Sequence, residues 1–131
     1  NKVHLIASVL EDETTHQTVY RSSQANAQNV VQPESPEHQQ HSVQYGIDAT
    51  RLSDFFAPHS LDRIIFNFPH WRGKSNHRYN RALVKDFLES CVPVLRPETG
   101  RVHIALVKGQ SGMEANNVEE WRQAWTVPMF A

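Results

Sequence analysis

The sequence predicts an α/β domain built around a parallel sheet. Short apolar segments rich in β-branched residues alternate along the chain with helical segments, in the order strand, helix, strand, short helix, strand, long helix, strand, helix. Such alternation is typical of parallel strands with helices on both faces of the sheet. The chain has 131 residues, which is enough for one domain with a modest core.

The first strand is expected at residues 3–8, where the sequence barely alternates between apolar and polar, as in a strand buried on both faces. Glu11 and Asp12 follow it, and carboxylates in front of a helix ordinarily cap that helix and suit its dipole. Residues 14–31 predict a weak surface helix, because Gln, Asn and Ser are frequent and apolar positions are sparse. Residues 32–42, with two prolines, predict an exposed polar loop.

The second strand is expected at residues 43–47. Asp48 follows it, and its ordinary role is to cap the short helix expected at residues 51–56. Residues 64–68 form an apolar run with β-branched and aromatic side chains, which predicts the central strand.

A long amphipathic helix comes next, because apolar residues recur there at helical spacing. The residues expected in the core are Leu83, Val84, Phe87, Leu88, Cys91 and Leu95. Cys91 belongs to this stripe and is therefore expected to be a buried apolar residue, not a nucleophile. Residues 101–108 predict the last strand, in which His103 is expected to pack, and Asn117 is expected to cap a final helix.

Composition limits the function only weakly. The formal net charge is −1, so any nucleic-acid-binding surface must be local. Cys91 is the only cysteine, which excludes an internal disulfide and a cysteine zinc cluster and favours an intracellular protein. No apolar run is long enough to span a bilayer. Because the sequence starts at Asn1 and stops within an apolar segment, we expect a piece of a longer protein.

The most informative stretch is Asn67–His70, at the end of the central strand. Asn67 places a polar amide there, Pro69 has no N–H to continue a ladder, and the His70 imidazole can exchange a proton near neutral pH. Ligands of open α/β sheets collect at the carboxyl ends of strands, so this junction is the candidate site. The alternative is a strand followed by a capped turn that carries no chemistry.

The following residues, 71–81, contain cations and aromatic rings without any acid. Interleaved groups of this kind suit phosphate contacts and base stacking. A flexible solvated loop explains the same composition equally well. The members of the run are Trp71, Arg72, Lys74, His77, Arg78, Tyr79 and Arg81.

Three strings together resemble a known family: Asp48-Ala49-Thr50, then Asp62 through His70, then Gly73-Lys74. They are similar to the 25S rRNA uridine-N3 methyltransferases, and the likeness covers most of residues 3–108. The resemblance implies a Rossmann-like class I methyltransferase sheet that binds S-adenosylmethionine, an rRNA substrate, and a nucleolar or nuclear location. It implies no metal.

The resemblance also implies residue roles. Glu11, or less favourably Asp12, would hold the ribose hydroxyls of the cofactor, and Asp48 with Ala49 would contact its adenine. The string Asn67, Phe68, Pro69, His70 is similar to the Asn/Asp-Pro-Pro-aromatic motif of amino-group methyltransferases, in which an amide and a backbone carbonyl hold the target nitrogen. Asn67 therefore belongs to both the cofactor and the catalytic sets.

The chemistry of uridine agrees with these roles. N3 of uracil must lose a proton to become nucleophilic, so a neutral imidazole at His70 is a reasonable general base. The base must also be unpaired before its N3 edge is accessible. Trp71, Arg72, Lys74 and Arg78 are the candidate RNA-binding residues.

One departure from the family leaves alternatives open. The family's glycine-rich cofactor loop follows a strand that would precede Asn1, and none of the five glycines here forms a Gly-x-Gly. In the family that strand lies between the strands at 3–8 and 64–68, so without it these two are not expected to be neighbours. The alternatives are a non-catalytic Rossmann-like module that binds RNA or protein, and a methyltransferase of the same fold with another substrate.

Overall fold

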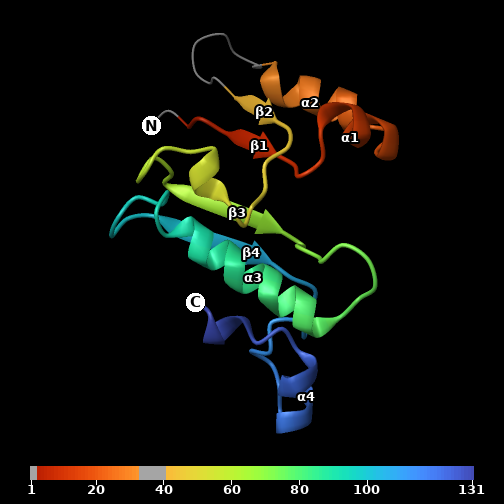
Figure 1. Cartoon of the computed structure of the whole chain (residues 1–131), viewed down its shortest axis with the longest axis vertical. Coiled ribbons are helices and arrows are strands. Elements are labelled where there is room, and N and C mark those ends of the chain that lie inside the picture. The colour runs from red at the N-terminus through yellow and green to blue at the C-terminus, as the bar shows by residue number, and fades with distance from the viewer. Residues whose placement is uncertain (1–2, 33–40) are drawn as a thin grey trace. The chain divides into compact units, whose positions relative to one another are not determined.

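The computed structural model describes residues 3–32 and 41–131 of the chain. The described residues form a mixed α/β structure with two small parallel sheets and four α-helices (Figure 1). The expected alternation of strands and helices is thus confirmed, as is parallel pairing. Of the polar loop predicted at 32–42, residues 33–40 lie outside the described part. The chain divides into two compact units, Asn1–Asp48 and Ala49–Ala131, which are treated separately.

The first unit contains a parallel pair, β1 (Ile6–Ser8) and β2 (Ser42–Gln44). Both strands are shorter than expected. The prediction that residues 3–8 are buried on both faces is wrong, because Val3 and Leu5 are exposed and lie before the ladder begins. Within the described residues β1 pairs with β2 alone, so its other edge has no strand beside it.

The same unit has two helices in place of the single expected one, α1 (Glu13–Val19) and α2 (Ser23–Val31). The break follows from the β-branched and threonine-rich sequence of α1, which favours a helix only weakly, and Tyr20 ends α1 in an extended conformation. Both helices lie on the surface, as predicted, since Ser23 is the one buried residue in them. Asp12 caps α1, with its carboxylate accepting the Thr15 N–H at 2.9 Å.

The second unit contains the other parallel pair, β3 (Arg63–Asn67) and β4 (Arg101–Ala105), with Arg63 opposite Arg101 and Asn67 opposite Ala105. The long helix α3 (His77–Cys91) runs along this pair (Figure 1). Its apolar stripe is the core, as predicted. The Phe66 ring lies 4.6 Å from that of Phe87, measured between centroids. Burial raises the pKa of the Cys91 thiol to about 12, so this thiol is not a nucleophile.

The opposite face of the β3–β4 pair is open in the described structure. Ile65 is 61% exposed, and its register partner His103 is exposed too. The prediction that His103 packs is therefore wrong. The physical reason is the two-residue period of a strand: the neighbours of His103, Val102 and Ile104, take the side facing α3, which leaves the histidine on the other side.

The remaining elements are short. The helix expected at 51–56 is a single 3-10 turn, η1 (Leu52–Asp54), whose N-cap residue Arg51 provides no side-chain cap. Helix α4 (Val118–Gln123) is capped by Asn117, as predicted, through a 2.9 Å bond from the Glu120 N–H. A second 3-10 turn, η2 (Val127–Met129), follows it. In the described part of the chain, no helix is long and apolar enough to cross a membrane.

Core packing in the second unit gives a first prediction. Phe87 is 1% exposed, so Phe87→Ala should lower the free energy of unfolding by about 3–5 kcal/mol through reduced burial and the cavity left behind. Phe55→Ala is the matched control, because Phe55 is 42% exposed and its replacement should cost about 1 kcal/mol or less. Urea unfolding of both variants measures this difference, and equal losses would show that the Phe66–Phe87 contact does not organise the unit.

Candidate functional site

The first candidate group lies just past the carboxyl ends of β1 and β2. The Gly46 N–H donates to the Glu11 carbonyl at 2.9 Å, and the Ile47 N–H donates to the Val9 carbonyl at 3.0 Å. These bonds hold the segments after both strands together, with Glu11 on one and Asp48 at the end of the other. The structure therefore brings these two predicted residues to the same end of one sheet.

Asp12 and Glu11 are distinguished by their contacts. The Asp12 carboxylate accepts the Thr15 N–H and also the Thr15 hydroxyl, at 2.9 and 2.7 Å. These two bonds lower the pKa of Asp12 and show that it serves as a helix cap. Glu11 is a partly buried residue whose side chain makes no hydrogen bond to any described residue, so its carboxylate stays available to a ligand.

Ala49 opens the second unit and is held by α3. Its carbonyl accepts the Ser90 hydroxyl at 2.5 Å. The Ser90 hydroxyl also lies 3.1 Å from the Phe87 carbonyl, within α3. This contact fixes the backbone at Ala49, and hence the residue directly after Asp48, against the helix.

The second candidate group begins where β3 ends. The side chain of Asn67 is exposed, and its amide makes no hydrogen bond in the described structure. Phe68 donates the last ladder bond, to the Ala105 carbonyl at 2.8 Å, and then adopts a left-handed conformation with φ of 49°. This conformation is strained for a bulky residue, and Phe68 is 63% exposed. A strained backbone that leaves an aromatic ring in solvent favours a ligand contact over a packing role.

His70 has a defined tautomer in its neutral form. Its Nδ1 lies 2.7 Å from the Trp71 carbonyl oxygen. A carbonyl only accepts hydrogen bonds, so Nδ1 donates and the lone pair is on Nε2. The ring is exposed and meets Trp125 edge to face, with 6.4 Å between centroids. The atom free to take a proton is therefore Nε2. Pro69, between Phe68 and His70, is buried and anchors this turn.

The loop that follows is held by a residue that sequence reasoning missed. Asn80 is fully buried in α3, its Oδ1 accepts the Trp71 N–H at 2.8 Å, and its Nδ2 donates to the Asn76 carbonyl at 3.1 Å. It lies on the stripe of Val84, Phe87 and Cys91. A polar residue at an apolar position of that stripe was the available signal.

Five members of the predicted basic and aromatic run are exposed, whereas His77 and Arg81 are partly buried. Trp71 and Tyr79 stack with ring centroids 5.3 Å apart and 24° between planes, and they are 43% and 52% exposed. Arg72, Lys74 and Arg78 are exposed, and none forms an ion pair with a described residue. Half of the run is not a loop, since α3 already begins at His77. We call Trp71, Arg72, Lys74, Arg78 and Tyr79 the stacking surface.

These features define a mixed α/β protein with polar groups gathered at the carboxyl ends of parallel strands. A family model described as rRNA (uridine-N3-)-methyltransferase BTM5-like matches residues 1–131, so the chain belongs to this BMT5-like family. No group of three side chains able to hold a metal ion occurs among residues 3–32 and 41–131.

Curated relatives extend the comparison. The chain is 41% identical over 92 residues to the human "Ferredoxin-fold anticodon-binding domain-containing protein 1" and 39% identical to its mouse homolog, which covers 68% of this chain and 15% of each relative. It is 33% identical over 57 residues to a tRNA (guanine-N(7)-)-methyltransferase of Streptococcus suis, which covers 44% of this chain and 26% of that protein. No solved structure matches the chain.

The buried amide gives a second prediction. Asn80→Ala leaves the Trp71 N–H without its partner and should lower the free energy of unfolding by about 1–3 kcal/mol. Asn29→Ala, at an exposed position of α2, should change it by less than about 0.5 kcal/mol. Hydrogen exchange at Trp71 provides the site-specific readout. Unchanged protection of that N–H in Asn80→Ala would contradict the proposed anchoring of the loop.

Proposed function

We propose that the chain is part of an RNA methyltransferase that uses S-adenosylmethionine and methylates N3 of a uridine in large-subunit rRNA. The observation that carries this proposal is the family match over the whole chain. Beyond the end of β3, the unbonded Asn67 amide and the exposed residue His70, whose Nδ1 is held by the Trp71 carbonyl, agree with it. A nucleolar or nuclear location follows from an rRNA substrate.

The residues present fit the proposed cofactor. The carboxylate of Glu11, which makes no hydrogen bond to a described residue, suits a pair of ribose hydroxyls, which donate hydrogen bonds. Asp48 and Ala49, which follow β2, are proposed to contact the adenine, and the Asn67 amide to face the methionine end. When bound, S-adenosylmethionine supplies an electrophilic methyl group.

The chain's own residues would prepare the uridine. His70 Nε2 accepts the proton of N3, while the Trp71 carbonyl holds the Nδ1–H and stabilises the imidazolium that results. The Asn67 amide and the Phe68 backbone orient the uracil edge, and the exposed Phe68 ring offers a stacking face. Loss of this proton would leave N3 nucleophilic, and S-adenosylmethionine held by Glu11, Asp48 and Ala49 would supply the methyl group. Positioning of this kind supplies much of a barrier reduction.

The sheet that this function requires is also part of the proposal. We infer that the fold is Rossmann-like and that each parallel pair is part of a larger sheet. The support is that each strand pairs with one other strand in the described residues, so an edge of each pair remains for a further strand. An unpaired edge carries N–H and C=O groups that favour such an addition.

A methyltransferase of the same fold with another RNA substrate is the second candidate function. The likeness to the Streptococcus suis tRNA (guanine-N(7)-)-methyltransferase favours it. A non-catalytic module is the third, and the absence of a Gly-x-Gly from the sequence favours it. Labelled methyl transfer to separated rRNA and tRNA distinguishes the three candidates. Label in rRNA supports the first, label in tRNA supports the second, and no label in either supports the third.

Cofactor binding gives a third prediction. S-adenosylmethionine at about a hundredfold over its dissociation constant should stabilise the full-length protein by about 2.7 kcal/mol, seen as a higher thermal midpoint. Asp48→Ala should remove the increase caused by the cofactor. Comparing each variant with and without cofactor cancels any loss of stability from the substitution itself. No increase in the unsubstituted protein would leave the non-catalytic module as the better account.

The general base gives a fourth prediction. His70→Ala should lower the rate of methyl transfer to rRNA by about 10²- to 10⁴-fold, with partial recovery at higher pH because hydroxide can then remove the N3 proton. His103→Ala is the matched control, because His103 is an exposed histidine on the open face of the β3–β4 pair. Full activity of His70→Ala at neutral pH would exclude the base role.

A further inference from the structure

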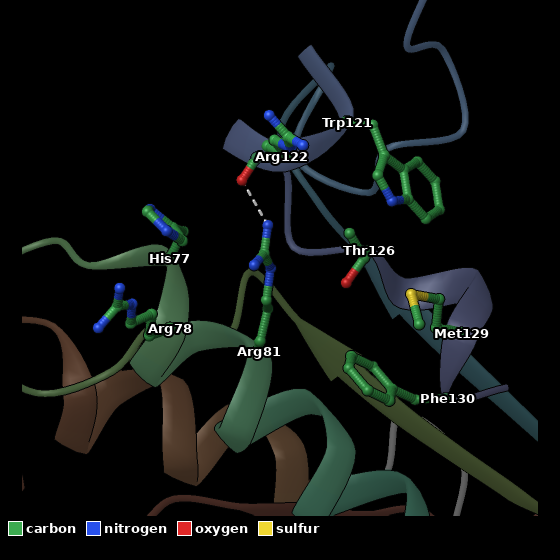
Figure 2. Close-up of a pocket in the computed structure, with 8 residues that line it drawn as sticks. All are labelled: His77, Arg78, Arg81, Trp121, Arg122, Thr126, Met129 and Phe130. Atoms are coloured by element: carbon green, nitrogen blue, oxygen red, sulfur yellow. Dashed lines mark hydrogen bonds between the residues drawn. The ribbon is translucent and has the colours of Figure 1, made fainter. Parts of the chain in front are cut away.

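A pocket of about 470 Å³ lies between the start of α3 and the segment formed by α4 and η2, within the second unit. It is separate from Asn67–His70, and of the stacking surface it shares Arg78 alone. Figure 2 shows its lining, with the basic side chains toward one side and Trp121, Met129 and Phe130 toward the other. The lining residues are His77, Arg78, Arg81, Trp121, Arg122, Thr126, Met129 and Phe130.

The electrostatics of the pocket favour an anion. Three arginines and a histidine line it, and no lining residue is acidic. The two carboxylates of α4 are engaged elsewhere: Glu119 accepts from Gln123 at 3.0 Å, and Glu120 accepts from the Asn116 N–H at 2.8 Å. Neither neutralises Arg122, and no ion pair within the described residues involves an arginine of the pocket.

Arg81 holds the two walls together. Its Nε and Nη2 donate to the Ala124 carbonyl at 2.9 and 2.6 Å, and Nη2 also donates to the Arg122 carbonyl at 2.5 Å (Figure 2). These carbonyls end α4, where a cation also suits the helix dipole. Arg81 is therefore a positioning residue. The side chain of Arg122 makes no hydrogen bond or ion pair with a described residue, so its guanidinium is available to a ligand.

The indole of Trp121 offers a face on which a flat ring can stack. Trp121 is half-buried and packs on Gly112, where an added Cβ would lie 3.0 Å from two carbons of the indole. The indole is thus held in place by the chain itself. A pocket lined by both basic groups and an aromatic ring matches a nucleotide, whose phosphate pairs with guanidinium groups and whose base stacks on an aromatic ring.

We propose that this pocket binds one phosphate of a single-stranded RNA through Arg122, with the adjoining base on Trp121. The inference rests on the proposed function for its choice of RNA. It adds a second RNA contact to that of the stacking surface, with which the pocket shares Arg78. A free nucleotide shares the same chemistry, so the experiment must separate the two sources.

Binding of a fluorescently labelled oligouridylate to the full-length protein, without S-adenosylmethionine, tests the proposal. Arg122→Glu should weaken binding about tenfold at moderate salt and reduce the slope of log K against log salt by about 0.7, the value for one fewer neutralised phosphate on a single strand. Arg21→Glu is the matched control, because Arg21 is an exposed arginine of the first unit, and it should bind like the unsubstituted protein. Thermal midpoints of both variants show whether each is folded.

The possible outcomes separate the pocket from the catalytic proposal. Weaker binding and a smaller salt slope in Arg122→Glu alone support the pocket, even if the protein transfers no methyl group. Equal binding by Arg122→Glu and Arg21→Glu overturns it, even if methyl transfer to rRNA is observed. Absence of oligouridylate binding by the unsubstituted protein also overturns it. Uridine monophosphate that competes as well as the oligonucleotide would show that the pocket takes a free nucleotide, and this too would overturn the proposal.

Discussion

The packing of α3 on one face of the β3–β4 pair is the constraint on which the second unit depends. The contact between Phe66 and Phe87 fixes the helix on the strands, and the buried stripe of α3 leaves its first turns free to carry polar side chains. Because β3 ends at Asn67 and α3 begins at His77, the loop between them must reverse over the same end of the pair. The candidate catalytic residues lie at this reversal.

Two neighbouring residues of α3, Asn80 and Arg81, attach other segments to the helix through hydrogen bonds and not through apolar packing. Asn80 holds the loop at Trp71, and Arg81 holds the end of α4. A buried polar group is costly unless it is paired, so the contact between the buried Asn80 and Trp71 tolerates little displacement. One turn of one helix therefore positions both the loop after the Asn67–His70 string and one wall of the pocket.

The sequence was informative where a pattern has a local cause. The apolar spacing of α3, the Asn117 cap and the end of a strand before Pro69 each depend on neighbouring residues, and each is seen in the structure. The outward direction of His103 depends on which face of the strand packs against α3. The break between α1 and α2 depends on marginal helix propensity. The pocket around Arg122 depends on segments about 40 residues apart in the sequence. Periodicity alone does not carry that information.

Arg78 connects the two basic regions of the unit. It lies in the first turn of α3, beside Tyr79 of the stacking surface, and it also lines the pocket with Arg122. A net charge of −1 means that attraction of a polyanion must come from local groups such as these, because the rest of the chain provides no excess of cations. An RNA strand that contacted both regions would release counterions at each of them, and its affinity would therefore exceed that of an RNA bound at one region only. The proposed RNA path through Arg78 would thus reconcile a nearly neutral chain with the proposed RNA substrate.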